Sequence, residues 1–399
     1  MDSDTIKKMV NTYTINTYNR FEPVFVEGKG VRVKDPEGRE YIDFTSGIGV
    51  NALGFCDPGW VAAVQAQAAS LQHVSNYYYS APVAHAAEKL SILTGMPCAF
   101  FANSGAEANE CAIKAARKYS FMKYGQDKED GFNRNRIVTL GGSFHGRTMA
   151  TITATGQDSF HKYFTPFLQG FDYSVTNDVA SLHETVTEET CAIMIEFVQG
   201  EGGVVDLDAG FVDEILGLCK KNDILLIADE VQTGVGRTGK FMAYDHFDVK
   251  PDIVTIAKGL GGGLPIGCVL FNEKTKSALG PGDHGTTFGG NPVVCAGADY
   301  VLSKFMDGGG FLSSIEEKGA YFREKVLSIP GVNGVSGLGL LIGLDVGEKK
   351  PGAVCEEAIK RGLLVLTAKN RVRLLPPLII ERPDSDEGLS ILAEAIAAV

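Results

Sequence analysis

Short apolar runs alternate with longer stretches of helical periodicity through the middle of this chain. The runs are mostly β-branched or aliphatic, which is typical of strands buried on both faces of a sheet. They cover residues 98–102, 137–140, 192–196, 224–228, 253–257 and 268–271. Two intervening stretches, residues 104–119 and 210–221, carry small or apolar residues at helical spacing. This alternation predicts an α/β fold built on a mostly parallel sheet.

The two ends of the chain have a different pattern. Residues 24–43 suggest short strands joined by turns. After Asn291-Pro292 come two helical stretches, short strands around residues 340–346 and 372–375, and a final helix from Asp386. Since 399 residues are enough for two domains, we expect three parts. They are residues 1–45, an N-terminal segment that joins the small domain; residues 46–292, a large domain; and residues 293–399, a smaller α+β domain.

Composition and short patterns exclude several classes of function. The net charge is −12 and Lys and Arg form no long block, so no nucleic-acid partner is expected. No apolar run is long enough to span a membrane and the N-terminus has no apolar signal core, which predicts a cytoplasmic protein. The histidines show no metal-ligand spacing, so no metal site is expected. The eight cysteines form no C-x-x-C pair; Cys98, Cys191 and Cys268 illustrate the reduced, buried thiols that we expect.

Two charged residues stand at the ends of successive apolar runs. Asp229 ends one run, and Lys258 follows the next and opens a glycine-rich loop. If the two strands are neighbours in a parallel sheet, both side chains emerge at the edge where ligands bind in α/β folds. A desolvated lysine is a Schiff-base nucleophile, and a carboxylate can keep a pyridine nitrogen protonated. Each residue alone is also compatible with a surface lysine or an acidic turn former.

A phosphate site is suggested by N-S-G-A-E-A-N-E, which follows the run at residues 98–102 and begins a helix. Free N–H groups at a helix N-terminus favour a phosphate, and Gly105 allows close approach of the backbone. The same residues satisfy an ordinary capping box, Ser104 with Glu107, and both interpretations can hold together.

The segment G-S-F-H-G-R-T offers an aromatic ring, Phe144, that can lie on a planar cofactor, and a guanidinium, Arg147, that can bind a substrate carboxylate. In isolation the first is also typical of a core residue and the second of a surface ion pair. Three further charged residues are equally ambiguous alone: Glu196, Glu201 and Arg373.

Residues 234–240, G-V-G-R-T-G-K, match two nucleotide-binding patterns in part. The G-x-G-x-x-G spacing is present, and Lys240 nearly completes a P-loop. However, Phe241 occupies the position of the P-loop hydroxyl, and no long amphipathic helix follows. A plain glycine-rich loop is therefore favoured over a nucleotide site.

Together and in this order, the motifs resemble the class III aminotransferases of pyridoxal-phosphate fold type I. The resemblance covers nearly the whole chain and rests on S-G-A-E-A-N, F-H-G-R-T, Q-G-E-G-G, D-E-V-Q-T-G-V-G-R-T-G, A-K-G-L-G-G-G-L-P-I-G and G-G-N-P. It implies a large domain with a mostly parallel seven-stranded sheet and a smaller α+β domain. It also implies pyridoxal 5'-phosphate as cofactor.

The resemblance implies a role for each matching residue. Lys258 is expected to carry the cofactor as a Schiff base and to shuttle the proton, while Asp229 pairs with the pyridine nitrogen. The other cofactor contacts that it implies come from Phe144 and Val231 on the ring, Gln232 on the phenolic oxygen, and Ser104, Gly105 and Ala106 at the phosphate. Thr287 is expected to reach the phosphate of the neighbouring subunit, which implies a homodimer with shared active sites.

For the substrates, the resemblance implies that Arg147 and Thr286 hold the carboxylate end, while Glu201 covers Arg373 until 2-oxoglutarate arrives. The fragments F-T-S-G-I-G-V-N-A-L-G, H-V-S-N-Y-Y-Y and R-L-L-P-P-L point to N-acetylornithine as amine donor. Ornithine, succinylornithine and 4-aminobutyrate are alternative donors with the same chemistry. From other classes, we considered a nucleotide-binding protein that uses residues 234–240 and a catalytically silent binding protein of the same fold.

Overall fold

The structure is a computed structural model that describes residues 1–125 and 131–399. Its centre is a seven-stranded sheet of order β4–β12–β11–β10–β7–β5–β6, in which β12 is antiparallel to both neighbours and the other pairs are parallel. The strands are β4 (Cys98–Ala102), β5 (Arg136–Leu140), β6 (Phe171–Ser174), β7 (Thr190–Ile195), β10 (Leu225–Asp229), β11 (Ile253–Ala257) and β12 (Gly267–Phe271). The predicted mostly parallel α/β sheet is therefore confirmed.

Alternate side chains of each central strand enter two separate hydrophobic clusters, one on each face of the sheet. On β7, Ile193 joins the cluster that contains Phe211 and Ile215 of α9 (Ala209–Asn222), whereas Met194 joins the cluster that contains Ala112 of α5 (Gly105–Tyr124). Because both faces are covered, the strands are apolar throughout rather than alternating, as predicted.

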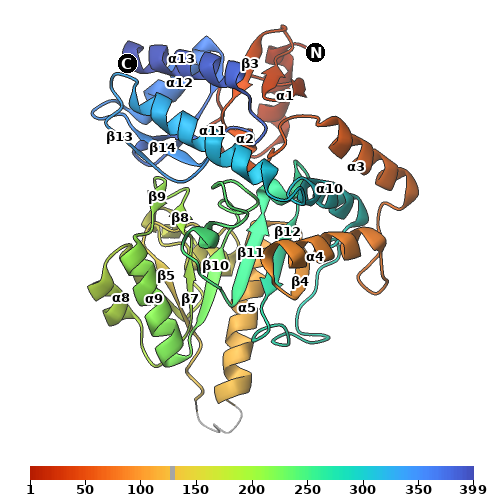
Figure 1. Ribbon diagram of the computed structural model, residues 1–399, viewed down its shortest axis with the longest axis vertical. Coiled ribbons are helices and arrows are strands. Elements are labelled where there is room, and N and C mark those ends of the chain that lie inside the picture. The colour runs from red at the N-terminus through yellow and green to blue at the C-terminus, as the bar shows by residue number, and fades with distance from the viewer. Residues whose placement is uncertain (126–130) are drawn as a thin grey trace.

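The helices of this part of the molecule lie around the sheet, with α8 and α9 beside β5 and β7 in Figure 1. They are α3 (Pro58–Ser70), α4 (Ala81–Thr94), α5 (Gly105–Tyr124), α6 (Met149–Ala154), α7 (Asp158–His161), α8 (Val179–Thr185) and α9 (Ala209–Asn222), with short 3-10 turns η1 (Ala243–His246) and η2 (Lys258–Gly261). A two-stranded ribbon, β8 (Val198–Gln199) with β9 (Val205–Asp206), leads from β7 toward the C-terminal part of the chain.

Two small sheets lie above the central sheet in Figure 1. One joins the N-terminal strands β1 (Glu27–Lys29), β2 (Arg32–Lys34) and β3 (Glu40–Asp43) to β15 (Leu363–Leu364). The other contains β13 (Gly334–Ser336), β14 (Ile342–Asp345), β17 (Arg371–Leu374) and β16 (Leu366–Ala368). The accompanying helices are α1 (Ser3–Tyr13), α2 (Ser46–Gly49), α11 (Gly310–Leu327), α12 (Pro351–Arg361) and α13 (Arg382–Ala398).

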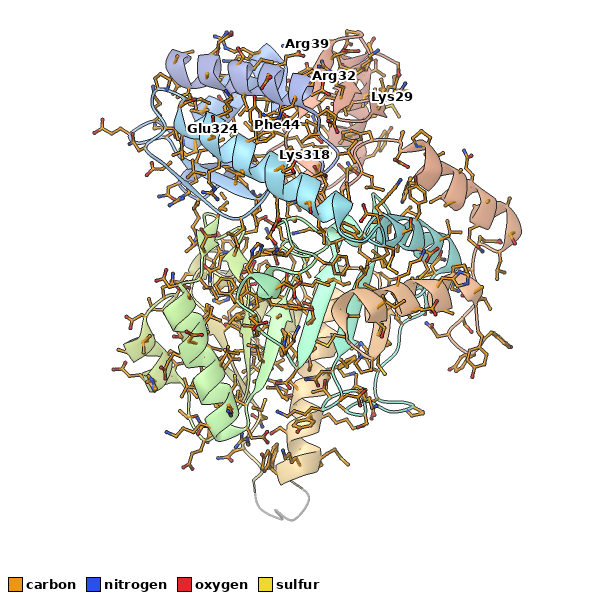
Figure 2. All side chains as sticks on the ribbon, viewed as in Figure 1. Lys29, Arg32, Arg39, Phe44, Lys318 and Glu324 are labelled. Atoms are coloured by element: carbon orange, nitrogen blue, oxygen red, sulfur yellow. The ribbon has the colours of Figure 1, made fainter. Side chains whose placement is uncertain are left out.

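Contacts between distant segments hold the N-terminal strands against the C-terminal helices. Phe44 lies beside α11 (Figure 2), and the centroid of its ring is 5.2 Å from that of Phe322 on this helix. Arg32 lies beside α13 and forms ion pairs of 2.6 Å with Asp384 and Glu387. By contrast, α10 (Pro292–Ser303) packs against α3 and α4. The division of the chain at residues 45 and 292 stays a prediction.

Several elements differ from the sequence-based expectation. The edge strand β6, F-D-Y-S, lacks an apolar run because only its two terminal residues are buried. Helix α13 begins at Arg382 rather than Asp386, since Pro383 fits the first helical turn. The prediction that Cys98 is buried was wrong: it begins β4 and is exposed, as is Cys56. No helix within the described residues is long and apolar enough to cross a membrane.

We expect the substitution Ile193→Ala on β7 to lower the free energy of unfolding by about 2–5 kcal/mol, because it opens a cavity at a fully buried position. Chemical denaturation measures this loss. Ile92→Ala is the matched control: Ile92 lies on α4 with 62% of its surface exposed, so its removal is expected to cost about 0.5 kcal/mol or less. Equal losses for the two variants would contradict the assignment of β7 to the core.

Candidate active site

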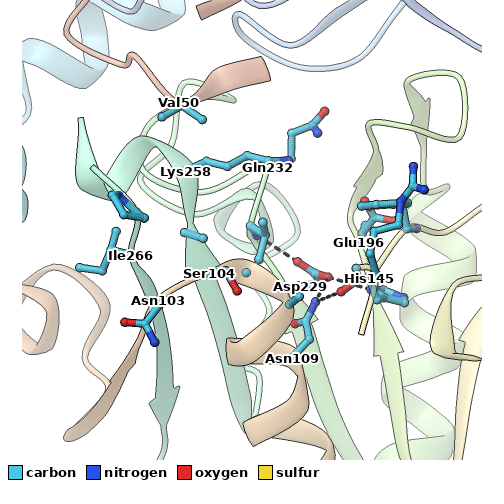
Figure 3. A pocket seen from close by; sticks show the side chains of 18 of the residues that line it. Val50, Asn103, Ser104, Asn109, His145, Glu196, Asp229, Gln232, Lys258 and Ile266 are labelled. Atoms are coloured by element: carbon cyan, nitrogen blue, oxygen red, sulfur yellow. Dashed lines mark hydrogen bonds and ion pairs between the residues drawn. The ribbon is translucent and has the colours of Figure 1, made fainter. Parts of the chain in front are cut away.

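A cavity of about 470 Å³ opens at the carboxyl edge of the parallel strands (Figure 3). Segments that follow β4, β5, β7, β10 and β11 all contribute to its wall. Nine of the residues predicted from sequence line it: Ser104, Gly105, Ala106, Phe144, Arg147, Asp229, Val231, Gln232 and Lys258. Four predicted residues are absent from the lining: Glu201, Thr286, Thr287 and Arg373.

Lys258 follows the last residue of β11 and begins η2 with a left-handed backbone, φ 44°. Burial lowers the pKa of its ammonium group; the Glu201 carboxylate opposes this effect, and the Arg373 guanidinium reinforces it. Within the described part of the chain, no acidic side chain approaches its Nζ within 4.0 Å. A lysine in such a position has an increased fraction of neutral, nucleophilic amine.

Asp229 ends β10, the parallel neighbour of β11, and is only 3% exposed. Its Oδ2 accepts hydrogen bonds from His145 Nδ1 at 2.7 Å and Asn109 Nδ2 at 2.8 Å, and its Oδ1 accepts one from the Val231 N–H at 3.0 Å (Figure 3). Three donors around one buried carboxylate compensate for its lost hydration. They also fix the direction in which it faces the cavity.

Sequence reasoning missed His145 and Asn109 as site residues. Asn109 lies on the buried side of α5, and its Nδ2 also donates to the His145 carbonyl at 2.7 Å. One signal was available for Asn109: it is a polar residue within the stripe of small residues that packs α5 onto the sheet. A buried amide is usually present to satisfy another polar group. For His145, the sequence offers no comparable signal beyond its place between Phe144 and Arg147.

The N-terminus of α5 points into the cavity. The Ser104 hydroxyl accepts a hydrogen bond from the Glu107 N–H at 3.2 Å, so the expected cap is present. Within the described residues, the N–H groups of Gly105 and Ala106 have no acceptor. A Cβ at Gly105 would lie 2.6 Å from Val231 Cγ1, so only glycine allows this approach. Free N–H groups at the start of a long helix suit a bound phosphate.

A glycine on the antiparallel strand supports this turn from behind. Gly267, the first residue of β12, packs so closely against the helix start that a Cβ there would lie 2.1 Å from the Ser104 carbonyl oxygen. The position of Ser104 and Gly105 therefore depends on the absence of a side chain at residue 267.

The loop after β5 places Phe144 and Arg147 at the cavity wall. The Arg147 guanidinium lies over the rings of Phe160 and Phe144, 4.3 Å and 5.7 Å from their centroids. The Phe144 N–H donates to Glu196 Oε2 at 2.9 Å. Burial, and then the Asp229 carboxylate, raise the pKa of Glu196 well above its usual value, which favours its neutral form.

Glu201 and Arg373 form an ion pair beside the cavity. The distance from Arg373 Nη1 to Glu201 Oε1 is 2.6 Å, and Gln232 bonds both partners, accepting from Arg373 at 3.1 Å and donating to Glu201 at 3.3 Å. Although burial opposes it, the Arg373 charge lowers the pKa of Glu201. Because Gln232 itself lines the cavity, this pair is connected to it through one side chain.

Thr286 and Thr287 lie on a loop at the border of the site. The Thr286 hydroxyl accepts a hydrogen bond at 3.0 Å from the amide of Asn103, a lining residue. Thr287 is exposed. The structure therefore brings neither threonine into the cavity of its own chain.

The glycine-rich loop at residues 234–240 does not form a phosphate site. Arg237 is 2% exposed and lies against the C-terminal part of the chain, and Lys240 pairs with Glu316 of α11 at 3.0 Å. The segment that follows is the short η1 turn rather than a helix that could offer free N–H groups. The plain-loop interpretation is the one that the geometry supports.

Comparisons with known proteins identify a family that matches nearly the whole chain. Residues 14–396 match the family model described as "Aminotransferase class-III". The acetylornithine aminotransferase of Haemophilus ducreyi is 48% identical over 399 residues, which is the whole of both chains. The solved acetylornithine aminotransferase of Elizabethkingia anophelis is 31% identical, with a TM-score of 0.87 and full coverage of both chains. A solved ornithine aminotransferase of Toxoplasma gondii, whose active site holds pyridoxal phosphate at partial occupancy, is 30% identical with a TM-score of 0.91, covering 99% of this chain and 94% of that one.

We expect Gly267→Ala to displace the turn at Ser104 and to weaken the binding of a phosphate group at the start of α5 by roughly tenfold or more, since an error of about 1 Å in a binding group is costly. Absorbance titration of the apoprotein with pyridoxal phosphate measures the affinity. The matched control is Gly210→Ala on α9, where an added Cβ meets no atom within 4 Å. A folded Gly267→Ala protein with unchanged affinity would show that the turn does not bind the phosphate.

Proposed function

The chain belongs to the class III aminotransferase family and is an aminotransferase, and from this premise we propose that it binds pyridoxal 5'-phosphate through Lys258 and transfers the terminal amino group of N-acetylornithine to 2-oxoglutarate. The products are N-acetylglutamate 5-semialdehyde and glutamate. A reaction of this kind supplies an intermediate of arginine biosynthesis.

The observation that carries the proposal is the arrangement of Lys258 and Asp229 around one cavity. They follow adjacent parallel strands, and the free N–H groups of α5 lie on the same cavity. An amine, a carboxylate for the ring nitrogen and a phosphate cradle are the three contacts that pyridoxal phosphate requires. The donor set of this cavity fits the cofactor.

When bound, pyridoxal phosphate supplies an electron sink for the negative charge that develops on the substrate carbon. Asp229, held by His145 and Asn109, keeps the ring nitrogen protonated. Phe144, Val231 and Gln232 line the cavity; the first two would flank the ring and Gln232 would bond its phenolic oxygen. The Lys258 amine would accept the proton from the substrate carbon and pass it on, a role that its lowered pKa favours at neutral pH.

The ion pair of Glu201 and Arg373 gives the site two states of charge. While the two side chains are paired, the guanidinium is neutralised and the donor is not drawn in by its own α-carboxylate. When 2-oxoglutarate enters, its carboxylate replaces Glu201 as the partner of Arg373. Arg147 holds the carboxylate at the other end of the substrate, whereas Thr286, which lies outside the cavity of its own chain, would join it in the site of a second copy of the chain.

Similarity in sequence supports N-acetylornithine as the donor more directly than similarity in fold. The relative that shares 48% of its residues is an acetylornithine aminotransferase, whereas the Toxoplasma gondii structure with the higher TM-score is an ornithine aminotransferase. Ornithine is thus the second candidate, followed by succinylornithine and 4-aminobutyrate. These donors differ only at the end remote from the reacting amine.

We expect the purified holoenzyme to be yellow and to lose this absorption when N-acetylornithine is added without a keto acid; 2-oxoglutarate then restores it. Spectra before and after each addition test the cofactor and both substrates. The control is Lys258→Ala, which is expected to hold no covalently bound chromophore because it lacks the amine. A yellow enzyme that responds to ornithine with a higher kcat/KM than to N-acetylornithine would replace the proposed donor.

A second copy of the chain is the proposed partner. Asn76 donates to the carbonyls of Thr286 and Gly289, which ties two loops together. These loops present an aromatic patch of four rings, each more than 60% exposed: Tyr77, Tyr78, Tyr79 and Phe288. An apolar patch of this kind is typical of a contact surface. Thr287 stands within it, so a homodimer can bring this threonine to the phosphate of the other subunit.

We expect sedimentation to give a dimer and a mixture of two inactive variants, Lys258→Ala and Thr287→Glu, to regain activity after exchange of subunits. In the mixed dimer, one site takes its lysine from one chain and its threonine from the other, so that site is intact. Each variant assayed alone is the control. Absence of recovery in a proven mixed dimer would mean that Thr287 serves the site of its own chain.

A further inference from the structure

The glycine-rich loop at residues 234–240 holds a wholly buried arginine to which the reaction assigns no role. Arg237 Nη1 donates to the carbonyl of Leu340 at 3.2 Å and to that of Pro376 at 2.5 Å. Its own carbonyl oxygen accepts a hydrogen bond from the Leu340 N–H at 2.9 Å. Arg237, in the loop that follows β10, therefore forms hydrogen bonds with two separate segments of the C-terminal part of the chain.

The two carbonyls that accept from Arg237, those of Leu340 and Pro376, lie next to the ends of two neighbouring strands. Strand β14 pairs antiparallel with β17, with Ile342 opposite Leu374 and Gly343 opposite Arg373. Leu340 precedes β14 and Pro376 follows β17, so both lie just beyond the same end of this strand pair. The pair of Gly343 and Arg373 directly follows the pair of Ile342 and Leu374 along the ladder. The hydrogen bonds of Arg237 therefore hold the end of the β14–β17 strand pair that carries Arg373.

Other contacts leave this end of the strand pair little freedom. A Cβ on Gly339 would lie 2.3 Å from the Thr238 carbonyl carbon, so the backbones of the two loops touch. On the far side, the Leu375 N–H donates to the Phe44 carbonyl at 2.7 Å, and its carbonyl accepts from the Ser46 hydroxyl at 2.6 Å.

The charge of Arg237 has a counterpart in Asp43, which is 1% exposed. Burial lowers the pKa of the Arg237 guanidinium to about 9, and the Asp43 carboxylate counteracts that effect. Within the described residues, Arg237 Nη2 and Asp43 Oδ2 have no hydrogen-bond partner. A buried, partly satisfied cation contributes little stability compared with an apolar residue of the same size, but it can specify one geometry. Since a buried arginine adds little stability here, we interpret the role of Arg237 as positioning the segments that it contacts.

We infer that Arg237 is a positioning residue that sets the place of Arg373 against Glu201 and the cavity, and thereby the recognition of the acceptor carboxylate that lies beside the reacting carbon. The inference rests on the proposed function, in which Arg373 binds 2-oxoglutarate. The bond between Arg373 and Glu201 is directional and short, at 2.6 Å, so a shift of β17 weakens it and misplaces the guanidinium for the diacid. The donor does not use Arg373 and is affected less.

The test compares Arg237→Met and Arg237→Lys with the control Arg134→Met, all as holoenzymes. Arg134 also donates to two main-chain carbonyls, those of Asn222 and Asp223, but at the opposite edge of the sheet. Stopped-flow absorbance measures the two half-reactions separately, and calorimetry measures the binding of glutarate, an unreactive dicarboxylate. Thermal unfolding identifies the variants that fold.

For Arg237→Met, we expect KM for 2-oxoglutarate and the dissociation constant of glutarate to rise by roughly tenfold, with the N-acetylornithine half-reaction changed by about twofold or less. Arg237→Lys keeps the charge but loses the forked geometry, so we expect a smaller rise in KM for 2-oxoglutarate and in the dissociation constant of glutarate. This variant provides the test if Arg237→Met does not fold. Arg134→Met is expected to leave both half-reactions unchanged.

Parallel losses in both half-reactions, or folded variants with unchanged acceptor binding, would overturn the inference. A crystal structure of the Arg237 variant shows the position of the Arg373 side chain directly. We expect Arg373 to lie about 1 Å or more farther from Glu201. If the unsubstituted enzyme does not use 2-oxoglutarate, the proposed function fails, whereas the movement of Arg373 still decides the positioning role.

Discussion

The Asp229 carboxylate lies at the end of a central strand with almost no contact with solvent, and the rest of the site is arranged around it. An ionised carboxylate in such a place costs several kcal/mol unless donors replace its water. Here the donors come from three segments: Asn109 of α5, His145 of the loop after β5, and the main chain at Val231. Satisfying one buried charge therefore fixes a helix, a loop and a strand relative to one another.

The parallel pairing of β10 with β11 adds the second element, because it brings Lys258 to the same edge as Asp229. The only antiparallel strand in the central sheet as described, β12, then lies between β11 and β4 and supports the start of α5 through Gly267. A carboxylate, an amine and a helix N-terminus thus meet in one cavity as a consequence of strand order. The helix N-terminus is more than a hundred residues from both Asp229 and Lys258 in the sequence, and the sheet brings the three groups together.

The second layer of the site comes from the C-terminal part of the chain. Arg373 is on β17, in a sheet distinct from the central one, and contacts Glu201 and Gln232 across the boundary between them. Its place depends on how the two parts are joined. The joints include the main-chain hydrogen bond from the Leu375 N–H to the Phe44 carbonyl and the bonds of the buried Arg237 guanidinium, in a loop whose sequence only partly matches a nucleotide site.

The sequence by itself determined the strands, the main helices and the family, because buried parallel strands are apolar throughout and the motifs are local. It also singled out Lys258 and Asp229, since both stand at strand ends. It did not predict β6, which is short and polar, or the exposure of Cys98, which depends on where the sheet ends. Only the tertiary structure decided that His145 and Asn109 hold Asp229 and that Arg237 reaches Pro376. Such contacts join residues far apart in the chain, and no local spacing records the distance at which folding places them.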